Sequence, residues 1–247
     1  MSILVLGIRI DTHTRETALQ QAALWLGGGG QHTIFTPNPE MLVAAKKDPY
    51  FREVLNQGSL NLCDGRGIEL VSRGQVTRIP GIEYMFDVCT LSAQKGTKVY
   101  LLGSGSIDTV EKTKNVLLKK FPTLHIVGVH PGLSIQQSAS RIEYTAEENE
   151  KILADIRKES PAVLFVAFGH GKQEKWISEN MKRLPSVRIA MGVGGAFDTV
   201  SGRYPRAPKL LRHVGLEWLW RLCIQPWRIV RIWNATVRFL YLCVTQK

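Results

Sequence analysis

The residue best suited to catalysis stands where an apolar run gives way to a polar turn. In NLCDGRGI, Asp64 directly follows an apolar run and is flanked by Gly65 and Gly67, which permit close backbone approach. A carboxylate there can act as a general base if burial tunes its pKa toward neutrality. An N-cap or Asx turn explains the same residues equally well. We predict Asp64 as the catalytic base, and the structural interpretation stands beside it.

Two further junctions of this kind carry uncharged polar side chains. FTPNPEML places Thr36 and Asn38 after an apolar run. They are either a ligand-binding pair or part of a well-formed helix start with Asn38 as N-cap, and both interpretations can hold at once. FGHGKQEKW places Gln173 at a helix start, where an amide suits recognition of sugar hydroxyls or a base. His170 beside it is of a type more often structural or exposed than catalytic.

Two glycine-rich turns are candidates for holding a nucleotide. In LLGSGSIDTVEKT the turn lies between a predicted strand and a predicted helix, an arrangement that can cradle phosphate or a nucleoside. It lacks the third glycine and the acidic ribose partner of the dinucleotide fingerprint, and MGVGGAFD has no GK[ST] after it. These absences argue against NAD and against a P-loop. The nucleotide-binding candidates are Gly103, Ser104, Gly192, Gly194 and Gly195.

These junctions need strands that end at a common edge. Short apolar runs alternate with amphipathic helical patterns, as in HTIFT then PEMLVAAKK and in AVLFVAFG then QEKWISENMKR. This alternation predicts an α/β fold, a layered, mainly parallel sheet flanked by helices. Ligands of such folds bind beyond the carboxyl ends of the strands, so the polar junctions are expected to meet. TAEENEKIL, with Thr145 and Glu148, predicts a capping box without chemistry.

The alternation stops after RIAMGVGGAFD. We predict an α/β catalytic domain over residues 1–200 and a basic, amphipathic C-terminal appendage over residues 201–247, whose helix breaks at Pro226. The appendage holds nine Lys and Arg residues against one acid, so it carries +8 of the chain's net charge of +11. Such a basic end suggests phosphate, in nucleic acid, anionic lipid or a diphosphate substrate.

The stretch RLCIQPWRIVRIW embeds arginines among aromatic and aliphatic residues. On an ideal helix Arg228, Arg231 and Arg238 fall within an arc of about 80°, with apolar residues over much of the remainder. Three arginines in about 18 residues suit a membrane surface better than a span. The alternatives are packing on its own domain or on a partner subunit, and nucleic-acid binding, which the excess of aliphatic residues disfavours.

The composition is that of a folded, globular protein of 247 residues, 44% hydrophobic and 21% charged. Its cysteines are far apart and lack zinc-type spacing, so they predict buried thiols of a reducing compartment. The apolar run before Gly7 is too short for a signal peptide, and a cytoplasmic location is expected. The four cysteines are Cys63, Cys89, Cys223 and Cys243.

Several of these motifs resemble the WecG/TagA/CpsF glycosyltransferases, in order and over nearly the whole chain. They are FTPNPEMLVAA, CDGRGIELVSR, RIPGIEYM, KVYLLGS, GKQEKW, GVGGAFDTVSGRYPRAP and GLEWLWRLCIQPWRIVR. The resemblance implies an inverting, metal-independent transfer of a sugar from a UDP-sugar to a sugar on undecaprenyl diphosphate, at the cytoplasmic membrane face. The TagA branch transfers N-acetylmannosamine in making the teichoic acid linkage unit.

The resemblance also implies roles for individual residues. Asp64 matches the family's base, Thr36 and Asn38 its polar pair, and Gln173 its glutamine. It also implies that three arginines of the tail bind a diphosphate, namely Arg221, Arg228 and Arg231. The family usually has proline at the place of Gly171 and glutamate at the place of Gln225, departures that bear on substrate details more than on the reaction type.

The predicted enzyme uses no cofactor and no metal. Its predicted partners are a UDP-sugar, the lipid-linked acceptor and the inner face of the cell membrane, without nucleic acid, and a homo-oligomer is allowed. The alternative function is a non-catalytic α/β module that binds anionic lipid or nucleic acid; an NAD-dependent oxidoreductase comes third. Mannosamine, its uronic acid and glucose derivatives all stay compatible as the donor sugar.

Overall fold

The centre of the molecule is a six-stranded sheet in the order β4-β3-β10-β9-β5-β6, in which every pair of neighbours is parallel. The structure is a computed structural model that describes residues 1–138, 141–208, 211 and 217–245, without the side chains of residues 217, 218, 221 and 228. The strands are β3 (His32–Phe35), β4 (Leu60–Asn61), β5 (Lys98–Gly103), β6 (His125–His130), β9 (Val163–Ala167) and β10 (Ile189–Gly192).

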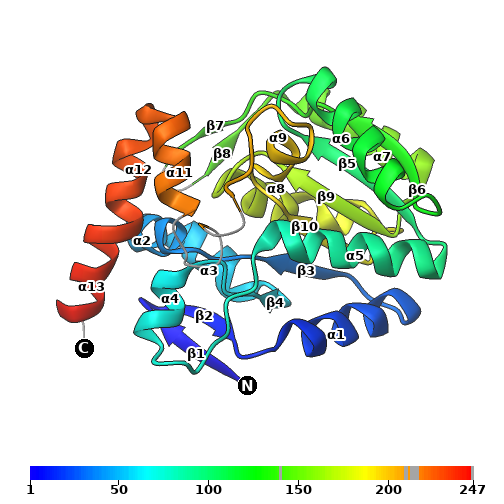
Figure 1. Ribbon diagram of the computed structural model, residues 1–247. Coiled ribbons are helices and arrows are strands. Elements are labelled where there is room, and N and C mark those ends of the chain that lie inside the picture. The colour runs from blue at the N-terminus through cyan, green and yellow to red at the C-terminus, as the bar shows by residue number, and fades with distance from the viewer. Residues whose placement is uncertain (139–140, 209–210, 212–216, 246–247) are drawn as a thin grey trace.

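Helices cover both faces of the sheet (Figure 1). One face carries α2 (Pro39–Lys47), α3 (Pro49–Gln57), α7 (Ala146–Glu159) and α8 (Lys172–Asn180), which η1 (Met181–Arg183) follows. The other face carries α1 (Arg15–Gly27), α5 (Gly81–Lys95), α6 (Ile107–Lys120) and α9 (Ala196–Val200). The short helix α4 (Arg66–Val71) follows β4.

Successive residues of each strand enter opposite cores, because side chains alternate across a pleated strand. In β9, Val163 and Phe165 pack with α1, α5 and α6, whereas Leu164 and Val166 pack with α2, α7 and α8. All four side chains are fully buried. A central parallel strand that is buried on both faces has a continuous run of apolar residues, as this one does. The predicted α/β fold is confirmed.

Two antiparallel hairpins stand apart from this sheet, and neither was predicted. One joins β1 (Ser2–Val5) to β2 (Ile8–Asp11), the other β7 (Gln136–Gln137) to β8 (Ile142–Glu143). Leu6 and Gly7 both have positive φ, 50° and 79°, in the two-residue turn of the first hairpin. Such turns match the twist of hairpin strands, but leucine gives no local signal for one.

Two local predictions need correction. Thr145 is the N-cap residue of α7, yet in the described structure its side chain makes no capping hydrogen bond, so the predicted capping box is wrong. Cys63 and Cys89 are buried, as expected, but Cys223 is exposed and Cys243 is half-buried. The latter two belong to the C-terminal helices, which present much of their surface to solvent.

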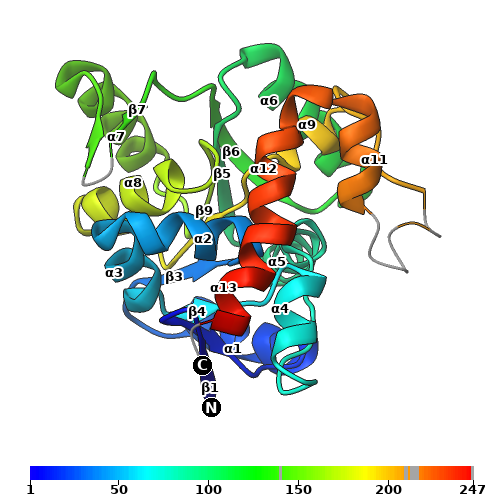
Figure 2. The ribbon, with the colours of Figure 1, turned by 90° about the vertical axis from the view of Figure 1, so that its left-hand side faces the viewer.

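The described C-terminal segment forms two antiparallel arms that meet at Pro226 (Figures 1 and 2). The second arm, from Pro226 onward, is called the C-terminal arm below. Pro226 ends the first helix as predicted, with Gln225 in a non-helical conformation. The arc predicted for the tail arginines assumed a regular helix with 100° per residue. This geometry does not apply along the second arm, because a 3₁₀ turn and a π turn interrupt it. The elements are α11 (Glu217–Ile224), η2 (Pro226–Arg228), α12 (Ile229–Trp233), η3 (Asn234–Arg238) and α13 (Phe239–Thr245).

The second arm lies across α2 and reaches α4 (Figure 2). Phe239 anchors it: the side chain has no exposed surface and belongs to the core that α2 and α3 cover. Gly67 makes room for this ring, since a Cβ there would lie 3.2 Å from it. Within the described residues, no helix is both long and apolar enough to cross a bilayer.

Candidate active site

A cavity of about 770 Å³ lies at the carboxyl ends of the sheet strands, a size typical of small-molecule sites. Its walls come from the segments that follow β3, β4, β5, β9 and β10, and from the C-terminal arm. The polar junctions expected to meet therefore do so. The predicted site residues that line this cavity are Thr36, Asn38, Asp64, Ser104, Gln173, Gly194, Gly195 and Arg231.

Asp64 is half-buried at the start of α5. The backbone N–H of Gly81, in the first turn of that helix, donates to Asp64 Oδ2 over 3.1 Å. A Cβ on Gly81 would lie 2.9 Å from Thr36 Oγ1 and 3.3 Å from Asp64 Oδ2, so glycine lets both side chains reach the helix. The positive end of the α5 dipole favours a carboxylate at this place.

The structural interpretation of Asp64 as a cap for the next helix is not what the fold shows. The N-cap of α4 is Gly65, and no side chain caps that helix in the described structure. Asn38, in contrast, does cap α2: its Oδ1 accepts from the N–H of Met41 over 3.0 Å. The predicted N-cap is therefore confirmed; Asn38 and Thr36 also line the cavity, and ligand binding by this pair stays a prediction.

The carboxamide of Gln173 is bonded within the protein at both ends. Its Oε1 accepts from the N–H of Gly194 over 2.9 Å, and its Nε2 donates to Glu174 Oε1 over 2.7 Å. The side chain is 3% exposed and crosses Gly192, where a Cβ would lie 2.7 Å from Nε2. Gly192 thus serves close packing and is not among the residues that line the cavity.

The turn after β5 does not offer the N–H groups of Ser104 and Gly105 to a phosphate, while nucleotide binding by Gly103 and Ser104 stays a prediction. The N–H of Ser104 donates to the Ala167 carbonyl and that of Gly105 to the Pro131 carbonyl, each over 2.9 Å. These N–H groups are therefore engaged with neighbouring segments. Gly103 has φ 121°, and its Cβ would lie 2.7 Å from the Ala167 backbone, so it permits close strand packing.

Arg231 reaches the cavity from the C-terminal arm and is held there by α2. Its Nε donates to Glu40 Oε1 over 2.7 Å, a second guanidinium nitrogen to Oε2 over 3.2 Å, and the same nitrogen lies 3.0 Å from His170 Nδ1. This paired geometry is the strong form of an arginine–carboxylate contact. Sequence reasoning did not find Glu40 as its partner, because 191 positions separate them.

Other cationic residues complete the wall. Arg66, Arg78 and Lys172 line the cavity. None of them was predicted as a site residue, although all three stand in the motifs quoted above, Arg66 in CDGRGIELVSR, Arg78 in RIPGIEYM and Lys172 in GKQEKW. The side chains of Arg221 and Arg228 lie outside the described residues, so their predicted part is not placed. Among the described residues, no three His, Cys, Asp or Glu side chains are grouped as a metal site.

Residues 3–247 match the family described as "Glycosyl transferase WecG/TagA/CpsF family". This chain belongs to that family. Two relatives carry the name N-acetylglucosaminyldiphosphoundecaprenol N-acetyl-beta-D-mannosaminyltransferase. The one from Staphylococcus aureus (strain NCTC 8325 / PS 47) is 28% identical over 243 residues, 96% of this chain and 90% of the relative. The one from Bacillus subtilis (strain 168) is 29% identical over 203 residues, 81% and 74% respectively.

In this WecG/TagA/CpsF chain, the loop before α8 lines the cavity and carries Gly171. Gly171 has φ 80°, which a proline at this position could not adopt, since its ring fixes φ near −65°. A Cβ at Gly171 would also lie 2.5 Å from Gln137 Nε2. The N–H that proline lacks donates to Glu174 Oε2 over 2.6 Å. The loop before α8 thus depends on glycine.

Proposed function

We propose that this family member transfers N-acetylmannosamine from its UDP-sugar to a sugar carried on undecaprenyl diphosphate, at the inner surface of the cell membrane. One observation carries the proposal: Asp64 from the sheet and Arg231 from the C-terminal arm line the same cavity. The names of the relatives support the sugar and the acceptor. The pathway would be the synthesis of teichoic acid or a related surface polymer.

In this mechanism Asp64 is the general base. It takes the proton of the acceptor hydroxyl as that oxygen bonds to the anomeric carbon of the donor. The bond from the same carbon to the diphosphate oxygen breaks, and its electron pair leaves with UDP. Attack from the face opposite the leaving group inverts the anomeric centre. The Gly81 N–H keeps one carboxylate oxygen in place for this step.

The departing UDP gains negative charge, which fixed cations in the cavity can stabilise. Arg231 is aimed into the cavity by Glu40, and Arg66, Arg78 and Lys172 line the same walls. Arginine also binds phosphate oxygens through two parallel N–H groups. The positive wall therefore suits a substrate pair that brings two diphosphates together.

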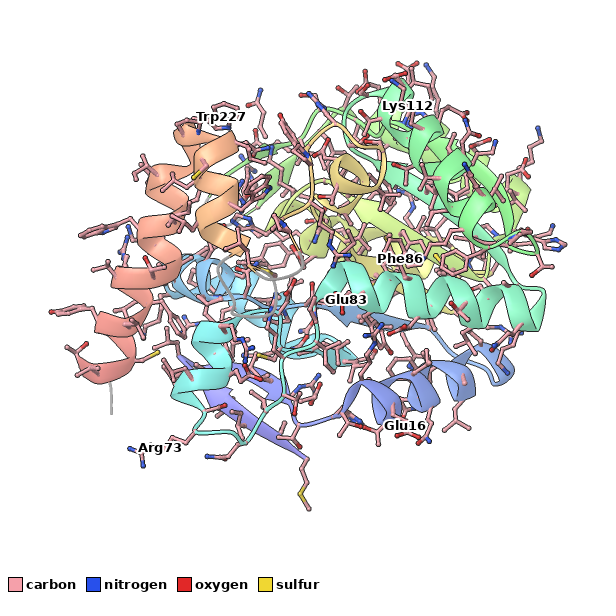
Figure 3. The ribbon with its side chains drawn as sticks, in the orientation of Figure 1. Glu16, Arg73, Glu83, Phe86, Lys112 and Trp227 are labelled. Carbon is pink, nitrogen blue, oxygen red and sulfur yellow. The ribbon has the colours of Figure 1, made fainter. Side chains whose placement is uncertain are left out.

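The outward side of the C-terminal arm carries apolar side chains that suit a membrane surface. Six apolar side chains along it are between 47% and 72% exposed. Trp227 belongs to η2 and lies at the tip where the two arms meet (Figure 3). Aromatic side chains on such a face sit at the level of lipid headgroups. The stripe consists of Trp227, Val230, Trp233, Val237, Tyr241 and Val244.

The test is a screen of UDP-sugars with a short-chain lipid diphosphate acceptor that carries N-acetylglucosamine, read by mass spectrometry. The expected product gains one N-acetylhexosamine from UDP-N-acetylmannosamine, with release of UDP. Transfer from another UDP-sugar alone would replace the donor assignment. No transfer from any donor, by protein that binds UDP, would contradict the proposed reaction.

A further inference from the structure

Behind the cavity wall lies a carboxyl group that the mechanism does not use. Glu174, in the first turn of α8, has no exposed surface, and the described residues give it no ion pair. Its oxygens accept from the N–H of Gly171 and from Gln173 Nε2. Burial raises the pKa of the Glu174 carboxyl to about 7, although these donors favour its ionised form.

The hydrogen bonds continue from this carboxylate to the cavity. Glu174 accepts from the amide nitrogen of Gln173, which turns the amide oxygen toward Gly194. The Gly194 N–H donates to that oxygen, and Gly194 and Gly195 line the cavity. Glu174 thus determines which end of the Gln173 amide meets the loop after β10.

We propose that Glu174 is a positioning residue which, through Gln173, holds the Gly194–Gly195 loop in the form that binds a nucleoside diphosphate. The inference rests on the proposed function for the identity of that ligand. Glu174 itself is separated from the cavity by Gln173, so it acts on the ligand through the wall. Its ionised state is the one that accepts both N–H donors.

Protonation of Glu174 would reverse the orientation of the amide. A neutral carboxyl group carries an O–H donor that faces the N–H groups of Gly171 and Gln173. Gln173 could satisfy it by turning its oxygen toward Glu174, but its NH₂ would then face the Gly194 N–H, and two donors cannot bond. The loop contact is therefore intact above the pKa of Glu174 and weakened below it, because the neutral carboxyl group keeps only part of its acceptor capacity.

Other titratable groups around α8 are engaged elsewhere. Lys175 bonds to Asp48 over 2.7 Å, and Glu179 accepts from Tyr50 and Tyr144 over 3.0 and 3.1 Å. The neighbouring strands β9 and β10 have no titratable side chains. His170 contacts Arg231, and Lys172 donates to the Ile135 carbonyl. The remaining charged side chains on the elements packed against α8 are exposed or half-exposed, namely Arg52, Glu53, Glu143, Lys182 and Arg183.

The test measures UDP binding by calorimetry at pH 6 and pH 8 in the wild type and in Glu174→Gln. With a pKa of about 7, about a tenth of Glu174 is ionised at pH 6 and about nine tenths at pH 8. If the neutral form binds about tenfold more weakly than the ionised form, the dissociation constant of Glu174→Gln should exceed the wild-type value about ninefold at pH 8 and only about twofold at pH 6. Glu179→Gln, on the exposed side of α8, is the matched control and should follow the wild type.

As the pH rises, the stability of the variant relative to the wild type should change in the direction opposite to its relative UDP affinity. This difference distinguishes a positioning role of Glu174 from a purely structural one. The folded pKa of Glu174 is raised above its unfolded value, so its stabilising contribution is full below about pH 4 and is lost as the pH rises through 7. Relative to the wild type, the melting temperature of Glu174→Gln should therefore rise between pH 5 and pH 8, while its UDP affinity falls.

Protection of the Gly194 amide from hydrogen exchange gives a readout that needs no ligand. Protection should fall in Glu174→Gln and also in Gln173→Met, which keeps the side-chain length, but not in Glu179→Gln. Unchanged protection together with wild-type UDP affinity at both pH values overturns the inference. A wild type that does not bind UDP contradicts the proposed donor, and the exchange result then decides the positioning role alone.

Discussion

The two walls of the cavity differ in how they are held. On the sheet side, Asp64 and Gln173 follow buried parallel strands and bond to backbone N–H groups of Gly81 and Gly194. On the other side, the C-terminal arm is anchored by the buried ring of Phe239, and its Arg231 is 44% exposed and bonds to the side chain of Glu40. One wall is part of the core, and the other is docked on it.

This difference suggests a division of labour. Groups that must hold a precise geometry, such as a base, benefit from a rigid support. A segment that meets both a diphosphate and a membrane gains from an outward apolar face, which the core cannot offer. If the two walls act on one substrate pair, damage to the sheet side should affect turnover most, and damage to the arm should affect docking and substrate capture.

The largest effect is expected for Asp64→Asn, which keeps the shape of the side chain but cannot accept the proton. Turnover should fall by about 10²- to 10⁴-fold, the usual contribution of a general base, with little change in UDP affinity. UDP release with the lipid-linked acceptor measures it. Asp108→Asn, in an exposed pair with Lys112, is the control. Normal turnover by Asp64→Asn would remove the base assignment.

Next in size is Phe239→Ala, which tests the docking of the arm. Removal of a fully buried phenylalanine ring costs about 3–5 kcal/mol, and here the cost should appear as release of the arm rather than unfolding of the sheet. Hydrogen exchange over residues 229–245 should rise sharply. Tyr241→Ala, on the exposed side of α13, should leave exchange almost unchanged. Equal exchange in the two variants would mean that Phe239 does not anchor the arm.

Arg231→Ala should have a smaller effect, on substrate capture. Loss of a charge-assisted contact to phosphate costs about 1.5–3 kcal/mol, so kcat/KM should fall at least tenfold, and the loss should shrink at high salt. Arg183→Ala, which breaks an exposed pair with Glu150, serves for comparison. A salt-independent loss would instead point to a packing role for Arg231.

The smallest effect is expected for the outward stripe of the arm. Trp227→Ser and Trp233→Ser should each reduce binding to anionic vesicles by about threefold, because each removes one aromatic contact with the headgroup region. Vesicle flotation measures this, with Leu24→Ser on α1 as an exposed apolar control. If the Leu24 variant loses as much binding as the tryptophan variants, the arm is not the membrane-facing side.

Much of the sheet side followed from local sequence signals. Continuous apolar runs indicated strands buried on both faces, and their polar ends were expected to converge, as Thr36, Asp64 and Gln173 do. Asn38 capped its helix as predicted, and Pro226 broke the tail helix. These features depend on neighbours in sequence, which is why a single chain was enough to predict them.

Contacts between distant segments were not predictable in the same way. The partners of Asp64, Arg231 and Gln173 are set by packing of elements 17, 191 and 21 positions away. The glycine turn after β5 resembled a phosphate cradle because its sequence cannot show that its N–H groups meet neighbouring carbonyls. Glu174 did leave a signal, three residues after Gly171, in the spacing of a capping box.

The joint action of the two walls is tested most directly by the chain ended at Pro205, which keeps Asp64 and the sheet but lacks the arm. Its turnover should be compared with that of the full chain, using UDP-N-acetylmannosamine and a short-chain acceptor that needs no membrane. Circular dichroism should confirm that the sheet is folded. The account predicts that UDP release falls at least a hundredfold. Full activity without the arm would contradict it.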